Sequence, residues 1–421
     1  MKASLYAAVF VLSACNGASD DRLVLAAHQG TRAVTDPGDS HEAICLTQRA
    51  NKPQGNGSEV WVRGFDGEGA ADAASVAADR AGNAYATRAD GGTLKFSSTG
   101  ELVWSKPYGS LVSIAANDDV IVAGSFTGSI EIEGVTLAAT GGKDVYVVTL
   151  DSAGVPKQRS VLGGAGDEEL AGVAVLQTGG VVVSVAGLGT TLLDSTGASV
   201  WTRELSGVVA VDPSDNVLVT GGFSGTQDFG GGPLVSAGGR DVFVVKLGAD
   251  GRHLFSARFG DTGSSQEGQA IASDFLGNIL VSGVFDGSID FGTGALSPAK
   301  CPADVWCARS GFVAKFGPDG SALWGTARGP LRALTGIASN SAGEVVISGA
   351  TPGGVPSYRI PLIAVLDAEG EELWEKSEWP ASGVGSGRRV AVDPCGDLLW
   401  ALSVRPSLDT SERAYLAKLS P

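Results

Sequence analysis

The chain has 421 residues, among them 62 Gly, and its net charge at pH 7 is −16. The length allows one large domain or two ordinary ones, and the high Gly content indicates many tight turns. No cluster of Lys and Arg is visible. An acidic chain without such a cluster is a poor partner for nucleic acid, because phosphate contacts need clustered cations.

The chain begins with the pattern of a secretory signal. Lys2 precedes an apolar run at residues 3–12, which is shorter than the ~20 residues that a membrane span requires. The letters LSAC at 12–15 resemble the lipobox of bacterial lipoproteins, in which Cys15 would carry the lipid and become the mature N-terminus. An ordinary signal peptide with an incidental cysteine is the alternative. We expect a signal peptide at 1–14.

Residues 15–55 form a segment rich in Gly, Asp and Ser that shows no sustained hydrophobic period. We expect a lipidated, flexible tail there, which would hold the protein in the cell envelope, at the outer membrane or the cell surface. No other segment is apolar and long enough to span a bilayer, so the lipid would be the only membrane contact.

One short motif occurs seven times along the rest of the chain. Each copy is an apolar run, a turn rich in Asp, Asn, Gly and Pro, and a second apolar run, which is the pattern of a β-hairpin. The copies lie at 76–87, 114–124, 173–187, 209–223, 271–285, 337–350 and 390–402.

A second motif alternates with the first and has six complete copies. Each contains a turn Gly, which indicates a backbone position with positive φ. Four residues after Gly100, Gly154, Gly197, Gly251, Gly320 and Gly370 stand Trp104, Gln158, Trp201, Phe255, Trp324 and Trp374. Five of these six residues are aromatic, so we expect a large packing residue at one fixed place in each repeat.

Two hairpins per repeat predict a four-stranded antiparallel unit, and seven such units predict an all-β, seven-bladed β-propeller. Strand cores such as 242–247 are almost continuously apolar, as in strands that are buried on both faces. The repeats are longer than the usual ~40–45 residues of a propeller blade. The excess lies between the second and third strands of repeats 2, 4 and 5, at 127–143, 224–240 and 286–310.

The last copy of the second motif is incomplete. AYLAKLSP at 414–421 supplies a third strand without a fourth, and the missing half occurs at 56–65, where Gly57 and Trp61 repeat the Gly-to-aromatic spacing. We therefore expect the propeller to span 56–421 and to close by pairing of an N-terminal strand (about 59–65) with a C-terminal strand (about 413–419). Such closure removes open sheet edges.

The segments FGDTGSSQEGQAIASDFLGNILVSGVFDGSIDFG at 259–292 and GGRDVFVVKLGADG at 238–251 resemble the bacterial seven-bladed β-propeller repeat family. The resemblance covers about 59–421, and repeats 1, 3 and 6 depart from it because they lack the DFG-type insertion. It implies a secreted or surface protein. It implies no catalytic residues, because the members share a repeat and not a chemistry, and propellers host many functions.

The histidines show no catalytic or metal-binding pattern. His28 and His41 fall in the expected tail and His253 falls in a hairpin turn, so none has the partners of a zinc site or a Ser-His-Asp triad. The chain also lacks a G-x-S-x-G elbow, a P-loop and a G-x-G-x-x-G motif between strand and helix. We expect solvated surface histidines and no catalytic residue.

Acidic residues gather in the loops that lead into three of the repeats. They are Glu68 and Asp72 before the first, Asp167, Glu168 and Glu169 before the third, and Asp261 and Glu267 before the fifth. These loops are expected at the mouth of the propeller axis, where converging carboxylates would hold Ca²⁺ through six to eight oxygen ligands. The alternative, which we favour, is solvated turn residues that form local hydrogen bonds.

The three insertions resemble one another and are expected to emerge on one face of the ring. Loops on a rigid scaffold are where binding usually resides, but the insertions would also suit added edge structure that only broadens a blade. Both interpretations stay open. Within the third insertion, Cys301 and Cys307 flank PADVW. A local disulfide is favoured there over zinc, because no CxxC pair and no nearby His accompany them.

Export would place the remaining cysteines in an oxidising compartment. Cys395 lies in the turn DPCGD of the last repeat, on the same face as the turn where the tail enters at Asn56. The 11 residues from Cys45 to Asn56 can reach up to ~36 Å when extended. We therefore expect a disulfide between Cys45 and Cys395.

The best functional interpretation is a noncatalytic envelope lipoprotein, monomeric, that binds a protein or glycan ligand through loops on one face. The alternative from another class is a calcium-dependent propeller hydrolase or lactonase with an acidic site at the axis.

Overall fold

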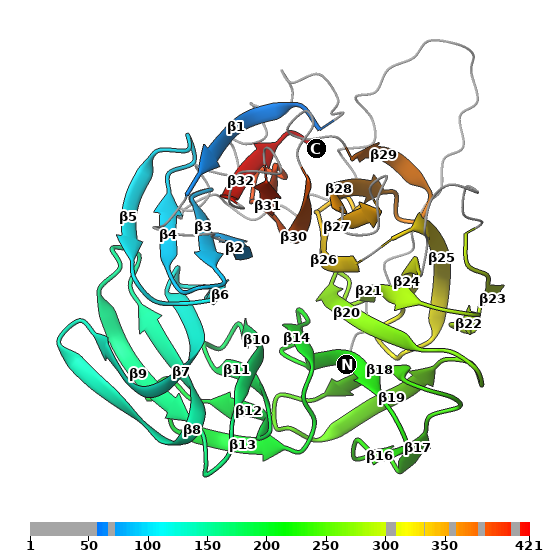
Figure 1. The fold of residues 1–421 in the computed structure, drawn as a ribbon, viewed down its shortest axis with the longest axis horizontal. Coiled ribbons are helices and arrows are strands. Elements are labelled where there is room, and N and C mark those ends of the chain that lie inside the picture. The colour runs from blue at the N-terminus through cyan, green and yellow to red at the C-terminus, as the bar shows by residue number, and fades with distance from the viewer. Residues whose placement is uncertain are drawn as a thin grey trace, which may run out of the picture.

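The computed structural model describes residues 57–65, 72–299, 309–331, 333–352, 359–377, 384–405 and 413–421. These residues form seven four-stranded antiparallel sheets around one axis (Figure 1). The predicted seven-bladed β-propeller is confirmed. The described residues contain no helix with the length and apolar character needed to cross a membrane.

Blades 1 to 3 are each built from four consecutive strands, in order from the axis outwards. Blade 1 holds β2 (Ala73–Ala78), β3 (Ala84–Arg88), β4 (Thr93–Phe96) and β5 (Leu102–Lys106). Blade 2 holds β6 (Leu111–Ile114), β7 (Val120–Ile132), β8 (Val135–Leu150) and β9 (Pro156–Leu162). Blade 3 holds β10 (Glu169–Val175), β11 (Val181–Ala186), β12 (Gly189–Leu193) and β13 (Ser199–Arg203).

Blades 4 to 6 follow the same order. Blade 4 holds β14 (Val208–Val211), β15 (Val217–Phe223), β18 (Asp241–Leu247) and β19 (His253–Phe259). Blade 5 holds β20 (Gln266–Ser273), β21 (Ile279–Phe285), β24 (Ser310–Phe316) and β25 (Ala322–Pro330). Blade 6 holds β26 (Ala333–Ser339), β27 (Val345–Pro352), β28 (Arg359–Leu366) and β29 (Glu372–Lys376).

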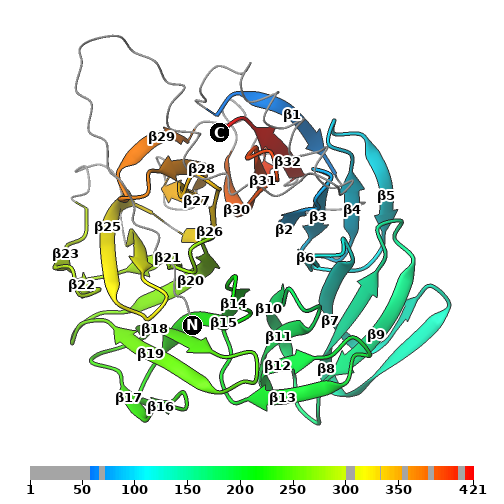
Figure 2. The same cartoon turned by 180° about the vertical axis from the view of Figure 1, so that it is seen from behind.

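Blade 7 joins the two ends of the chain. It holds β30 (Val384–Val392), β31 (Leu398–Arg405), β32 (Arg413–Leu419) and, outermost, β1 (Glu59–Gly64), as Figure 2 shows from behind. The backbone N–H of Ser420 donates a hydrogen bond to the carbonyl of Ser58 at 2.8 Å. The equivalent bond in blade 5, where the turn is continuous, runs from the N–H of Gly317 to the carbonyl of Ser321 at 2.7 Å. The first and last strands of the propeller, β1 and β32, are therefore joined by the same hydrogen bond that closes the continuous turn in other blades.

Successive strands are antiparallel, so the links fall on two opposite faces of the ring. The links between second and third strands share one face with the links between blades, and we call it the insertion face. The turns between first and second strands and between third and fourth strands lie on the other, which we call the turn face. Gly57 lies in the interrupted turn between β32 and β1, so it is on the turn face.

Three insertions extend the insertion face. The insertion of blade 2 lengthens β7 and β8 into one long hairpin. The insertion of blade 4 forms the strand pair β16 (Thr226–Asp228) and β17 (Pro233–Val235), and that of blade 5 forms the pair β22 (Ile289–Asp290) and β23 (Ala295–Leu296). They lie where the sequence predicted the additional residues of repeats 2, 4 and 5.

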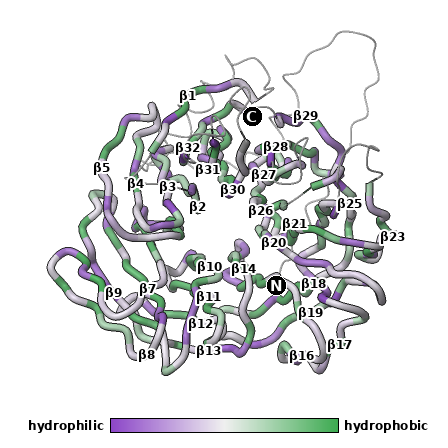
Figure 3. The backbone as a smooth tube through the Cα atoms, in the orientation of Figure 1, coloured by the Kyte–Doolittle hydropathy of each residue, from purple (hydrophilic) through white to green (hydrophobic). Residues whose placement is uncertain are grey.

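The apolar core is divided among the blade boundaries. The described residues form seven apolar clusters, and each joins two neighbouring blades. Figure 3 shows hydrophobic stretches along middle strands such as β11 and β21, which are buried over almost their whole length. This arrangement explains the continuous apolar runs, because each sheet is covered on both faces by its neighbours.

A second contact repeats at all seven boundaries. The aromatic residue of each outermost strand lies on the turn glycine of the next blade, and Gln158 takes its place in blade 2. The pairs are Trp61 on Gly100, Trp104 on Gly154, Gln158 on Gly197, Trp201 on Gly251, Phe255 on Gly320, Trp324 on Gly370 and Trp374 on Gly57. All seven glycines have positive φ. The indole N–H of Trp61 also donates to the carbonyl of Ser98 at 3.1 Å.

Four blades share a buried ion pair between the third strand and the first turn. The pairs are Lys95–Asp79, Lys246–Asp212, Lys315–Asp274 and Lys418–Asp393, at 3.7, 2.9, 3.1 and 2.6 Å. In the other three blades both positions change together. They hold Thr149 with Ala115, Leu192 with Leu176, and Val365 with Asn340. The chain thus never leaves one member of the pair buried without the other.

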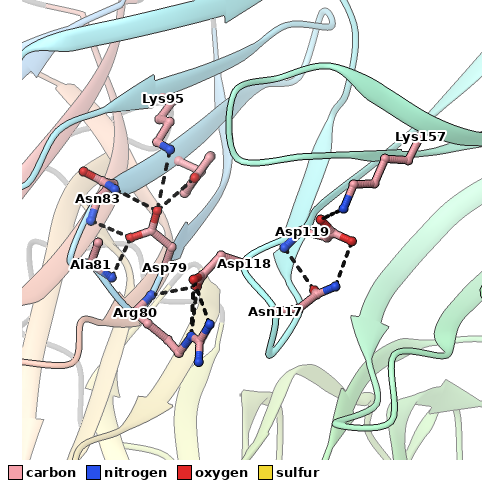
Figure 4. A network of polar contacts seen from close by, with 10 residues as sticks. Asp79, Arg80, Ala81, Asn83, Lys95, Asn117, Asp118, Asp119 and Lys157 are labelled. Atoms are coloured by element: carbon pink, nitrogen blue, oxygen red, sulfur yellow. Dashed lines mark hydrogen bonds and ion pairs between the residues drawn. The ribbon is translucent and has the colours of Figure 1, made fainter. Parts of the chain in front are cut away.

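Figure 4 shows how one such turn is held. Asp79 accepts hydrogen bonds from the backbone N–H groups of Ala81 and Asn83, at 3.0 and 2.9 Å, besides its contact with Lys95. Arg80 of the same turn reaches Asp118 in the first turn of blade 2, at 3.1 Å. The turn face is therefore tied together within blades and between them.

Candidate functional site

The acidic residues before blade 3 form hydrogen bonds and an ion pair with nearby residues of the chain. Asp167 accepts a hydrogen bond from the backbone N–H of Lys143 at 2.9 Å, and the buried Glu168 accepts one from Gly164 at 3.0 Å. Glu169 lies 3.6 Å from the Lys143 ammonium. These contacts attach the loop to the insertion of blade 2 and leave no set of oxygens facing a common point.

The acidic residues before blade 5 are engaged in a similar way. Asp261 accepts hydrogen bonds from the backbone N–H of Ser288 at 2.7 Å and from the Gln266 amide at 3.1 Å. The bond from Ser288 is the main reason that the pKa of Asp261 falls to about 2. Glu267 lies 3.4 Å from the guanidinium of Arg240.

Before blade 1, Asp72 pairs with Arg388 of blade 7, and Glu68 lies outside the described residues. Within the described part of the chain, no group of three His, Cys, Asp or Glu residues could hold a metal ion. The calcium alternative requires carboxylates that converge on the axis, and the described ones bond locally instead.

The only histidine in the described ranges is His253, at the start of β19. One ring nitrogen of His253 lies 3.0 Å from the hydroxyl of Ser256. The predicted surface histidines His28 and His41 lie outside the described residues, as does the lipidation candidate Cys15.

The cysteine predictions concern mostly residues that are not described. Cys395 takes part in a disulfide bond. Cys45, Cys301 and Cys307 lie outside the described residues. The pairing of Cys395 with Cys45 and the local bond between Cys301 and Cys307 therefore stay predictions.

Each insertion places a large apolar residue between blades. Ile132 in blade 2, Phe229 in blade 4 and Phe291 in blade 5 are all buried. Phe229 stacks on Phe243 with ring centroids 4.7 Å apart, and Phe291 lies 5.0 Å from Phe259 of the preceding blade. The outer strands of neighbouring blades diverge, and these side chains fill the space between them. In this respect the insertions are packing elements.

A groove accompanies the insertion of blade 4, at its boundary with blade 3. One cavity of about 470 Å³ opens on the insertion face, and a second of about 480 Å³ continues along the outside of the boundary. Both are lined by Glu204, Leu205 and Phe229. We call the two cavities together the blade 3–4 groove.

The groove has an apolar floor and a polar rim. Phe223, Phe229 and Phe243 form the floor of the first cavity, and all three are buried. Glu204 and Gln227 line the same cavity, and Glu204 is exposed. Ligand sites of ordinary size, ~300–1,000 Å³, combine an apolar lining with a few polar groups in this way. The groove is the candidate site of the described chain.

Sequence reasoning missed this groove. It forms because blade 3 connects its second and third strands through the short link Gly187–Leu188, whereas blade 4 carries an insertion beside it. The difference in length between the two repeats could be predicted from the sequence. The residues that line the groove could not be predicted, because they come from two blades and from the link between them.

No protein-family model matches the chain, and no curated protein matches it. Solved structures do match. The structure of U3-55K aligns with a TM-score of 0.55 at 10% identity, over 86% of this chain and 100% of that one. The WD40 repeats of RRP9 align with a TM-score of 0.55 at 11% identity, over 87% of this chain and 100% of that one.

The likeness is one of fold. A protein of unknown function from Bacteroides caccae aligns over 68% of this chain and 90% of that one, with a TM-score of 0.37 at 12% identity. At these identities the alignments with U3-55K and RRP9 show a fold similar to that of WD40 propellers, and the chemistry of the chain depends on its own residues.

Proposed function

We propose that the chain is a noncatalytic, lipid-anchored propeller of the cell envelope that binds an extended protein or glycan segment in the blade 3–4 groove. The lipid on Cys15 would be its only membrane contact, and it would act as a monomer. The LSAC motif and the preceding apolar run support the anchor. The charge of −16 supports a partner other than nucleic acid.

One observation carries the binding proposal. The two cavities adjoin at Leu205 and Phe229 and run from the insertion face along the outside of the ring. An extended ligand fits such a course better than a compact one. The buried aromatic floor supplies apolar contact area, while Glu204 and Gln227 provide hydrogen-bonding groups at the rim.

The test uses the whole chain as a probe of glycan and peptide arrays, followed by titration calorimetry with the ligands that it retains. Ser206 lines the first cavity, and Ser206→Trp would fill it with an indole. We expect this variant to lose at least about tenfold in affinity, which corresponds to ~1.4 kcal/mol.

Ser214→Trp is the matched control, because Ser214 is an exposed residue in a turn of blade 4 on the opposite face. It should bind like the parent protein. Equal affinities of the Ser206→Trp variant and the parent for every retained ligand would remove the groove from the proposal.

A further inference from the structure

Two large apolar residues follow one another at the tip of the turn between β20 and β21, on the turn face. Phe275 is 59% exposed and Leu276 is 64% exposed, and no other large apolar residue in the described part of the chain is more exposed than Leu276. Single exposed apolar residues are common on proteins, whereas contiguous ones mark interaction sites. We call these two residues the Phe275–Leu276 tip.

The turn holds the tip in a fixed conformation. The buried carboxylate of Asp274 accepts hydrogen bonds from the backbone N–H groups of Leu276 and Asn278, at 3.0 and 2.9 Å. It also lies 3.1 Å from the ammonium of Lys315. The backbone N–H of Gly277 donates to the carbonyl of Asp274 at 3.0 Å. A tip held in this way loses little conformational freedom when a partner covers it.

The other six blades carry no such pair at the equivalent positions, which are the second and third residues of the turn between first and second strands. There the chain reads Arg-Ala, Ala-Asn, Gln-Thr, Pro-Ser, Ser-Ala and Pro-Cys, beginning at residues 80, 116, 177, 213, 341 and 394. All of these residues except Cys395 are exposed. The fold therefore requires no large apolar side chain here, and packing does not explain Phe275 and Leu276.

The turn face around the tip is acidic. Its thirteen continuous turns hold seventeen Asp and Glu residues, two Arg and no Lys. Five of the seventeen acids are buried against lysines, namely Asp79, Asp212, Asp274, Asp393 and Asp397. The other twelve are at least partly exposed. Opposite charge on a partner would therefore be attracted to this face.

An acidic group also lies beside the tip itself. A Cβ on Gly277 would lie 3.7 Å from Cγ of Pro318, so the two turns of blade 5 are in contact. Pro318 is exposed and extends the apolar surface of the tip, and the exposed Asp319 follows it. Hydrogen bonds from Ser321 lower the pKa of Asp319, which keeps this carboxylate charged at neutral pH.

Apolar and acidic groups together select the kind of partner. Anionic lipid headgroups and nucleic acid would be repelled by the acidic turns. A second copy of the chain would bring two acidic faces together, which costs free energy. A protein surface that surrounds an apolar patch with Lys and Arg gains from both features, because apolar burial supplies affinity and opposite charge orients the encounter.

We propose that the turn face of blade 5 docks a basic protein partner, with Phe275 and Leu276 buried in an apolar part of its surface and the partner's Lys and Arg opposite the carboxylates of the surrounding turns. The tip belongs to blade 5, whereas residues of blades 3 and 4 line the blade 3–4 groove. The proposal therefore does not depend on the ligand of that groove.

The first experiment measures binding of a basic amphipathic peptide, two joined repeats of KLAKLAK, by titration calorimetry. The parent protein is the whole chain with Cys15→Ser, so that no lipid contributes. Phe275→Ser combined with Leu276→Ser should weaken binding at least about tenfold and leave the melting temperature unchanged, because both side chains are exposed. Val235→Ser is the matched control, since that side chain is 60% exposed on the insertion face, and it should bind like the parent. Equal affinities of the double variant and the parent, or no binding by the parent, would overturn the proposal.

The second experiment tests the chemistry of the partner. Peptides of the same length built from ELAELAE and KSAKSAK should each bind at least about tenfold more weakly than KLAKLAK, because the first reverses the charge and the second lacks the apolar side chains. Equal binding of either peptide would overturn the partner chemistry. Binding to vesicles of phosphatidylethanolamine and phosphatidylglycerol that the double variant loses would assign the tip to a membrane and overturn the protein partner. Dimers of the parent that the double variant lacks would assign the tip to a second copy and overturn it as well.

Discussion

The contact between a turn glycine and an aromatic ring of the preceding blade recurs at single-residue scale around the ring. At Gly100 an added Cβ would lie 2.7 Å from Cδ2 of Trp61. The φ angle there is +83°, which residues other than Gly adopt at a cost. The glycine therefore has two roles: it adopts the positive φ of the turn, and it leaves room for the indole to pack against the backbone.

Gly100→Ala and Gly343→Ala separate these two purposes. Both glycines have φ +83°, but an added Cβ at Gly343 meets only the Cβ of Ala368, at 3.7 Å. We expect Gly343→Ala to cost ~1–2 kcal/mol from the backbone alone. Gly100→Ala should cost roughly 1–3 kcal/mol more, because Trp61 must move. Urea denaturation measures both, and equal losses would show that the indole contact contributes nothing.

The buried Lys–Asp pairs give a second prediction at this scale. Lys246→Leu leaves Asp212 buried without its cation, which should cost about 3–5 kcal/mol at pH 7. Adding Asp212→Leu should restore at least half of the loss, because blade 3 packs Leu192 and Leu176 at the same two positions. Stability measured by urea denaturation of the parent, the single and the double variant tests this.

The pH dependence distinguishes this explanation from a simple packing defect. Burial raises the pKa of Asp212, but hydrogen bonds from Asn216 and Lys246 outweigh it, so the folded pKa lies below its ordinary value. The parent gains stability from this carboxylate above the ordinary aspartate pKa and loses it as the pH falls through the folded pKa. In Lys246→Leu the penalty should shrink as the pH falls to about 4 and Asp212 takes up a proton. A penalty that is the same at pH 7 and pH 4 would contradict the buried-charge account.

At the scale of elements, the strands and their turns were readable from the sequence because their signals are local. Alternating hairpin motifs gave all seven blades, and the Gly-to-aromatic spacing placed the outermost strands. The groove could not be foreseen, since it depends on where side chains of different blades meet.

The sequence was also insufficient for the insertions. Their lengths and positions could be predicted from the repeats, but whether they bind a ligand or pack between blades depended on where Phe229 and Phe291 point. Phe291→Ala should cost about 3–5 kcal/mol, because the ring fills the space between blades 4 and 5. Val235→Ala, in the insertion of blade 4, is the control, since that side chain is 60% exposed. Thermal melts that shift equally for both variants would argue against an anchoring role.

At the scale of the whole molecule, Gly57 and the turn that holds Cys395 lie on the same face. Cys395 is disulfide-bonded, and its turn lies on the turn face, as Gly57 does. We predict that Cys45 is its partner, so that a covalent bond ties the tail to the one blade built from both chain ends. Peptide mapping without reduction should find a Cys45–Cys395 peptide. A peptide that joins Cys395 to Cys301 or Cys307 would refute the pairing.

Ring closure through β1 gives the last prediction. Deleting residues 56–65 removes the outermost strand of blade 7, which exposes the backbone edge of β32 and leaves Gly100 without its indole. Exposed strand edges pair with other chains, so we expect aggregation or a large loss of stability. Trp61→Ala alone should cost ~3–5 kcal/mol, since the indole is buried. Deleting residues 16–40 is the control and should leave the melting temperature unchanged. If the protein without 56–65 stays monomeric and melts cooperatively at the parental temperature, the ring does not depend on this strand.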